Sequence, residues 1–256
     1  MNRSHTLAGH LLLSALAFIC AAVFTVAGAG TAQAAPKFIN PRVHPYKFIF
    51  YKGQSRYLKV RGYAAGETPV YKISSGSKYF KVNSQGKVTA KTYGTSKLTT
   101  TVGSVKKTVY VYCAKPQAYR ATRQALKMKN QKLRYSQLKR MSSRYVDCSS
   151  FVWRAYRPQK FYFGSPWGAP TAANEAKWCV RHGRRLNRAK FKKNVGLFKP
   201  GDVIFYTDGT KNGRYKNISH VEMYLGNDVL IHAAHKGIGY DYKAIVNSVV
   251  LTRPVR

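Results

Sequence analysis

One cysteine in the second half of the chain has the surroundings of a catalytic nucleophile. Cys148 stands in "YVDCSSFVWRAY", where Phe151, Val152 and Ala155 are apolar at helical spacing, which predicts a helix with one buried face. The thiol then lies in the first helical turn. The free N–H groups and dipole of a helix amino terminus stabilise an anion, which favours ionisation of a thiol there. The pattern therefore favours a reactive cysteine over a structural one.

Two histidines fall in a predicted antiparallel hairpin. "FKPGDVIFY" and "HVEMYLGNDVLIHAA" alternate apolar and polar residues across Pro-Gly and Gly-Asn turns, which is typical of antiparallel strands. His220 opens one strand and His232 lies at the end of the next. Pairing across the Gly226-Asn227 turn would bring the two side chains together. A cysteine with two such histidines fits a nucleophile, a base and a group that orients the base.

The first 34 residues are typical of a secretory signal peptide. Arg3 precedes the apolar stretch "LLLSALAFICAAVFTVAGAG", and the small-residue triplet Ala32-Gln33-Ala34 follows it, which predicts cleavage after Ala34. Because the apolar stretch is longer than most signal cores, an uncleaved membrane anchor is the alternative. We expect a secreted, wall-associated protein with no membrane contact once the signal is removed.

The charge of the chain is strongly one-sided. It contains 45 Lys and Arg residues against 8 Asp and Glu, and Glu67 is the only acid before Asp147. An exported basic protein requires an anionic partner, and peptidoglycan carboxylates and phosphate-bearing teichoic acids are the wall polymers that fit. Nucleic acid matches the charge equally well, but the sequence has no zinc-finger spacing, basic zipper or aromatic RNA-binding signature. We therefore predict wall polymers and no nucleic acid, and leave the oligomeric state open.

The pattern divides the remaining chain into three parts. Short alternating runs such as "YLKVRGY" and "KTVYVYC", separated by Gly and Ser turns, predict an antiparallel β-sandwich over residues 36–113. Residues 114–134 contain no acid and many helix formers, which predicts a basic helical linker. Packing of this helix on the domain that follows is favoured over contact with an anionic surface. Residues 135–256 carry the chemistry.

Three cysteines remain after the predicted cleavage, and three thiols cannot all pair within one chain. At least one of Cys113, Cys148 and Cys179 must therefore be free. A disulfide between Cys113 and Cys179 is one possibility. Two buried, inert thiols are favoured, because free cysteine is among the residues most often buried.

The β-rich part resembles a known domain family. "VNSQGKVTAKTYGTSKLTTTV" is similar to the strand-turn-strand signature of bacterial Ig-like domains of group 2. The resemblance implies an Ig-like sandwich over residues 36–113 that acts as a spacer or as a wall-binding module.

The order "DCSS", "PGDVIFY", "HVEMYLG", "IHA" resembles the NlpC family of cell-wall cysteine peptidases. That resemblance implies an α+β papain-like (NlpC-type) catalytic domain over residues 135–256. It also implies roles, with Cys148 as the nucleophile, His220 as the general base and His232 as the group that holds the base. Asp147, beside the nucleophile, and Ser149 match positions that bind substrate.

The sequence departs from the NlpC pattern at two places. Ser150 stands where the usual "DCSG" has glycine, which a helix tolerates. The "P-Y-x-W-G-G" stretch that normally precedes the cysteine is replaced by "RYSQLKRMSS". Tyr135 in this stretch lies close to the spacing of the family tyrosine, which assigns it to the substrate pocket.

The resemblance implies a peptidoglycan endopeptidase that cuts between D-γ-glutamyl and the diamino acid of stem peptides. An N-acetylmuramoyl-L-alanine amidase with the same Cys-His chemistry is an alternative, and a non-catalytic, basic wall-binding or adhesion protein is another. The chemistry requires no metal or organic cofactor. A metal site at His235 and Cys179 is disfavoured, because no fourth ligand stands at a suitable spacing.

Overall fold

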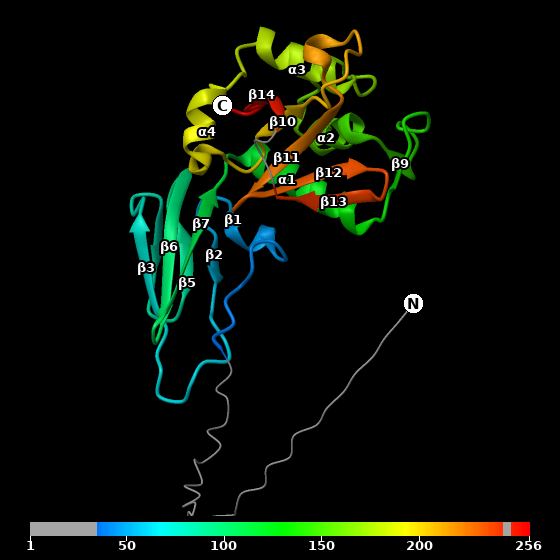
Figure 1. Ribbon diagram of the computed structural model, residues 1–256. Helices are drawn as coiled ribbons and strands as arrows, with labels where there is room; N and C mark the ends of the chain where they lie inside the picture. The colour runs from blue at the N-terminus through cyan, green and yellow to red at the C-terminus, as the bar shows by residue number, and fades with distance from the viewer. Residues whose placement is uncertain (1–34, 243–246) are drawn as a thin grey trace, which may run out of the picture. The chain divides into compact units, whose positions relative to one another are not determined.

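The computed structural model describes residues 35–242 and 247–256 (Figure 1). The predicted signal peptide, residues 1–34, lies outside the described residues. Among the helices of the described part, none is both long and apolar enough to cross a membrane.

The first part of the described chain is rich in strands. Its elements are η1 (Pro45–Phe48), β1 (Ile49–Phe50), β2 (Ser55–Tyr57), β3 (Val70–Ser75), β4 (Phe80–Val82), β5 (Lys87–Ala90), β6 (Gly94–Val102) and β7 (Val105–Cys113). They form one sheet in the order β1-β7-β6-β3 and a second in the order β2-β5-β4. Apolar side chains from both sheets share one core, including Phe50, Phe80 and Val111.

This arrangement is compatible with the predicted sandwich, and the group 2 Ig-like assignment stays a prediction. One pairing differs from the expected antiparallel pattern, because β1 runs parallel to β7. The reason is connectivity: the rest of the module separates the two strands along the chain, so no hairpin constrains their direction.

The basic linker forms the helix α1 (Pro116–Asn130). Ala118, Ala121, Ala125 and Met128 recur at intervals of three or four residues and are buried, which gives the helix one apolar face. That face belongs to the same core as the helix that begins at Cys148. The lysines and arginines of the linker are consequently left on its outer side.

The rest of the chain builds a helical layer on a five-stranded sheet. The short parallel strands β8 (Arg134–Tyr135) and β9 (Tyr145–Val146) lead into α2 (Cys148–Tyr156) and η2 (Arg157–Gln159). There follow α3 (Ala172–Arg181), α4 (Arg188–Lys193), η3 (Val195–Leu197), β10 (Val203–Tyr206), η4 (Tyr215–Asn217), β11 (His220–Gly226), β12 (Val229–Ala234), β13 (Gly237–Asp241) and β14 (Ser248–Thr252). The sheet order is β13-β12-β11-β10-β14, every pairing is antiparallel, and α2 packs against β11 and β12.

The hairpin that carries the histidines closes through a two-residue turn. Gly226 pairs with Val229, and the intervening Asn227 and Asp228 have positive φ of 50° and 60°, as a turn matched to strand twist requires. The side chain of Asn227 also accepts a hydrogen bond of 2.7 Å from the N–H of Tyr110 in β7 and donates one of 2.9 Å to its carbonyl. The turn therefore fixes the hairpin and ties it to the β-rich part.

Candidate active site

Cys148 is the first residue of α2, as the sequence predicted, and the helix start is tightly capped. The Asp147 carboxylate accepts a hydrogen bond of 2.7 Å from the N–H of Ser150, and the Ser150 hydroxyl accepts one of 2.9 Å from the N–H of Asp147. This reciprocal pair is a capping box. The serine that replaces the usual glycine of the pattern thus contributes directly to fixing the nucleophile.

The electrostatic surroundings of Cys148 differ from the sequence expectation. The residue is only 7% exposed. Burial, followed by the carboxyl groups of Asp147 and Glu175, raises the pKa of the thiol to about 12, although the backbone N–H groups of Val221 and Ser149 act in the opposite direction. The helix amino terminus alone would favour the thiolate, but burial outweighs it. The thiol is therefore neutral at neutral pH and needs a base to react.

The predicted histidine pair is brought together by the hairpin. His220, the first residue of β11, and His232 in β12 place Nε2 and Nδ1 at 2.8 Å from each other. Their rings meet edge to face with centroids 5.0 Å apart. His220 directly precedes Val221, whose N–H faces the Cys148 sulfur. The start of β11 therefore lies beside Cys148, and the two histidines lie next to each other, while their catalytic roles stay predictions.

A buried carboxylate that the sequence reasoning missed completes this cluster. Glu222 Oε1 lies 2.9 Å from His232 Nδ1 and 3.4 Å from His220 Nε2, and Glu222 is 3% exposed. Burial alone would raise the pKa of this carboxyl, but hydrogen bonds from both histidines and their charges hold it at about 2. The signal was present in the sequence, because Glu222 follows His220 by two residues and so shares its face of the strand.

His220, Glu222 and His232 are also the described residues whose ligand atoms gather closely enough to hold a metal ion, within 4.8 Å of one another. Their mutual hydrogen bonds account for this geometry without an ion. His235 and Cys179, which the sequence analysis considered and disfavoured as metal ligands, do not join this cluster.

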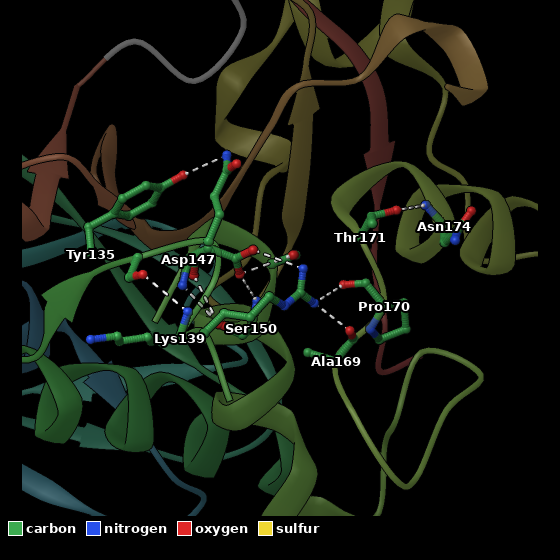
Figure 2. A network of polar contacts seen from close by, with 12 residues as sticks. Tyr135, Lys139, Asp147, Ser150, Ala169, Pro170, Thr171 and Asn174 are labelled. Atoms are coloured by element: carbon green, nitrogen blue, oxygen red, sulfur yellow. Dashed lines mark hydrogen bonds and ion pairs between the residues drawn. The ribbon is translucent and has the colours of Figure 1, made fainter. Parts of the chain in front are cut away.

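Asp147, predicted to bind substrate, forms polar contacts within the protein (Figure 2), and Ser149, also predicted to bind substrate, contacts it. The Asp147 carboxylate forms an ion pair of 2.8 Å with Arg140 Nη1 and accepts a hydrogen bond of 3.2 Å from the Ser149 hydroxyl. Arg140 Nη2 also donates to the carbonyls of Ala169 and Pro170. Arg140 lies in the loop before β9, and no sequence pattern marked it.

Tyr135 lies near the nucleophile, where the sequence placed the substrate pocket. Its ring packs against His235 with centroids 5.2 Å apart. Burial is the largest influence that raises the pKa of its phenol, and the nearby Cys148 and Asp147 add to that effect.

A second buried acid, Glu175 in α3, is fully buried with both carboxyl oxygens unpaired, and burial raises its pKa well above the usual range.

All three described cysteines are free and buried. The possible disulfide between Cys113 and Cys179 is therefore absent. Cys113 belongs to the core of the β-rich part, whereas Cys179 belongs to the core around Cys148, so the two thiols have separate packing environments.

A helix that begins with a cysteine and packs on an antiparallel sheet bearing two histidines is the arrangement expected of a papain-like α+β fold. Residues 134–253 match the model of the NlpC/P60 family. Over these residues the chain is similar to a family whose members are generally cysteine peptidases or amidases that act on peptidoglycan.

Solved structures similar to the chain include an NLP/P60-family protein similar to a lipoprotein from Staphylococcus aureus, at 17% identity and a TM-score of 0.40. That match covers 56% of this chain and 43% of the staphylococcal one. NlpC2 from Trichomonas vaginalis matches at 18% identity and a TM-score of 0.39, over 80% of this chain and 68% of its own. No curated protein matches the chain significantly.

Proposed function

We propose that the protein is a secreted peptidoglycan hydrolase, a cysteine endopeptidase that cuts stem peptides between D-γ-glutamyl and the diamino acid. The observation that supports this most directly is the 2.8 Å contact between His220 Nε2 and His232 Nδ1, beside the helix that begins at Cys148. An NlpC/P60 domain surrounds these residues. A purely structural role would not require two histidines and a buried carboxylate in one cluster.

The reaction begins from a neutral thiol. His220 takes the Cys148 proton as the sulfur attacks the amide carbonyl, because a thiol with a pKa of about 12 supplies almost no thiolate at neutral pH. Backbone N–H groups at the start of α2 stabilise the oxyanion. The imidazolium returns the proton to the leaving amine, and water then hydrolyses the thioester, with His220 accepting a proton from that water.

His232 and Glu222 hold the base in position during these steps. The ring of His220 is fixed through Nε2 by His232 and by Glu222 Oε1. The negative charge of Glu222 stabilises the imidazolium formed when His220 takes the proton. The two residues therefore act on the base and not on the substrate.

An N-acetylmuramoyl-L-alanine amidase would use the same cluster, and the bond cut is the difference between the two activities. The proposed roles of Tyr135, Asp147 and Ser149 in substrate binding stay predictions. The internal ion pair with Arg140 and the hydrogen bond from the Ser150 N–H support a capping and positioning role for Asp147.

The test uses purified peptidoglycan and mass spectrometry of the released fragments. Cys148→Ala and His220→Ala are each expected to abolish hydrolysis with unchanged thermal unfolding, whereas Cys179→Ala should keep it. Fragments ending in D-γ-glutamate support the endopeptidase, and free lactyl groups with intact stem peptides support the amidase. Substantial hydrolysis by Cys148→Ala would disprove the cysteine-peptidase mechanism.

A further inference from the structure

The folded surface is even more basic than the composition indicates. All eight acids of the chain lie in the described residues, and four of them, Asp147, Glu175, Asp202 and Glu222, are no more than 5% exposed. Only Asp208 and Asp228 are fully surface residues. The positive charges therefore face solvent with very few neighbouring carboxylates, which creates a strong field for anions.

Positively charged side chains line two adjoining hollows along α1. The two hollows share Lys129, and together they are called the α1 groove. The first, of about 1010 Å³, extends from η1 along α1 to β13, and the second, of about 500 Å³, continues from the end of α1 to β8 and β13. Among the described residues that line either hollow, none is acidic. Their cations are Arg120, Arg123, Lys127, Lys129, Lys132, Arg134 and Lys236.

The helix periodicity places several of these cations in a row. Arg120, Arg123 and Lys127 are exposed and follow one another at intervals of three and four residues, opposite the buried alanine face of α1. Within the described chain, no cation of the groove forms an ion pair with a carboxylate. Arg120 donates to the neutral Gln159 side chain, which leaves its charge uncompensated.

One end of the groove adjoins the candidate active site. Tyr135 lines the second hollow, and the same phenol is influenced by the nearby Cys148. A ligand lying in the α1 groove therefore approaches the nucleophile from the side of β8.

We propose that the α1 groove binds a phosphodiester-linked polyanion of the cell wall and holds the domain on wall that carries this polymer. A row of unpaired cations without carboxylates selects a repeating anion, and Arg and Lys are well suited to phosphate oxygens. This binding goes beyond the proposed hydrolysis and does not depend on it.

The aromatic residues of the groove favour such a polymer over a nucleic acid. Arg123 lies over the Tyr46 ring at 5.8 Å, and Lys129 lies over the Tyr240 ring at 5.0 Å from its centroid. Tyr119 packs edge to face against Tyr51. Single-stranded nucleic acids bind by stacking bases on open aromatic faces, and cations already occupy two of these faces.

The test measures co-sedimentation of residues 35–256 carrying Cys148→Ala, so that hydrolysis does not remove the wall. The groove variant combines Arg123→Glu, Lys127→Glu and Lys132→Glu. A matched control makes the same change of charge at exposed lysines of the β-rich part, with Lys81→Glu, Lys87→Glu and Lys106→Glu.

The groove variant is expected to bind phosphodiester-bearing walls at least about tenfold more weakly, and the control to change less than about twofold. The slope of log affinity against log salt should fall by roughly 0.7 for each phosphate that the variant no longer neutralises. Walls stripped of phosphodiester polymers with hydrofluoric acid should bind the parent protein and the groove variant equally weakly.

Three results would overturn the proposal. Equal losses of wall binding in the groove variant and in the control variant would show that the attraction is spread over the whole basic surface. Undiminished binding to stripped walls would show that phosphate is not recognised. Tighter binding of the groove to single-stranded DNA than to the soluble wall polymer at the same salt would identify nucleic acid as its occupant. Because hydrolysis is disabled throughout, none of these results depends on the proposed enzyme activity.

Discussion

The neutral state of the Cys148 thiol can be tested by removing its base. In His220→Ala, the thiol keeps its burial and the nearby carboxyl groups but loses the imidazole that accepts its proton. The pKa of about 12, against 9.0 for an unperturbed thiol, lowers the thiolate fraction at pH 7 by roughly 1000-fold. A more basic thiolate is also a better nucleophile. For a Brønsted slope near 0.45, the rate constant of the thiolate itself rises about 20-fold, which offsets part of this loss. We therefore expect Cys148 in His220→Ala to be alkylated at pH 7 about 50-fold more slowly than an unperturbed thiol.

The assay follows iodoacetamide labelling of the peptide that contains Cys148 by mass spectrometry from pH 7 to pH 10. The same peptide in the urea-unfolded chain is the reference. Burial slows access of the reagent at every pH, so the shape of the pH profile is the diagnostic quantity. In folded His220→Ala the rate should rise about tenfold per pH unit without levelling, whereas the unfolded chain levels near its ordinary pKa of about 9.

With His220 present, labelling at pH 7 should be faster than in His220→Ala, because the imidazole accepts the proton as the thiol reacts. Cys113 provides an internal comparison in the same samples, since burial raises the pKa of its thiol to about 11. A rate that levels below pH 8 in folded His220→Ala would refute the reasoning. It would mean that the helix amino terminus dominates over burial after all.

Two of the buried acids, Glu222 and Glu175, predict opposite dependences of stability on pH. The pKa of Glu222 is lowered from 4.5 to about 2 in the folded state, so its contribution is present above pH 4.5 and is lost as pH falls toward 2. In urea unfolding, the free energy of unfolding of the parent should fall by roughly 3 kcal/mol over this window, and that of Glu222→Gln should not show this loss. The same pH dependence in both proteins would contradict the prediction. The pKa of Glu175 is raised by burial, so its contribution is present below pH 4.5 and is lost as pH rises. Relative to Glu175→Gln, the parent should lose up to about 1.4 kcal/mol per pH unit above pH 5, and equal pH slopes would exclude a neutral Glu175.

The sequence predicted that the two histidines meet and that Cys148 starts a helix, but not the forces that set the protonation of these side chains. Strand alternation and the Gly-Asn turn were enough to place His220 near His232, because hairpin register follows from a two-residue period and a short turn. The capping residues before Cys148 were likewise readable from local pattern. The raised thiol pKa was not readable, since it depends on how deeply the fold buries Cys148 and on carboxyl groups near it, including that of Glu175 in α3.

Residues held by loops were the hardest to predict. Arg140 pairs with Asp147 from an irregular segment and is fixed by the carbonyls of Ala169 and Pro170, which no periodicity marks. Glu222 differs, because its two-residue spacing from His220 was visible and only its significance was missed. Ion pairs between residues distant in the chain could therefore be found only in the structure. The residues that share one face of a strand could be read from the sequence.

The distribution of buried charge gives a direction to proton transfer within the site. Burial and the carboxylate of Asp147 disfavour a negative sulfur at Cys148, which keeps the proton on the thiol in the absence of substrate. Glu222, held ionised by the histidines, favours a positive imidazole on the opposite side. When the carbonyl of a substrate accepts the electron pair of the sulfur, the negative charge moves to the oxyanion, where the N–H groups of the α2 amino terminus stabilise it. The penalty on the thiolate then no longer applies, while the stabilisation of the imidazolium remains. The protein therefore holds an unreactive thiol until a substrate occupies the site.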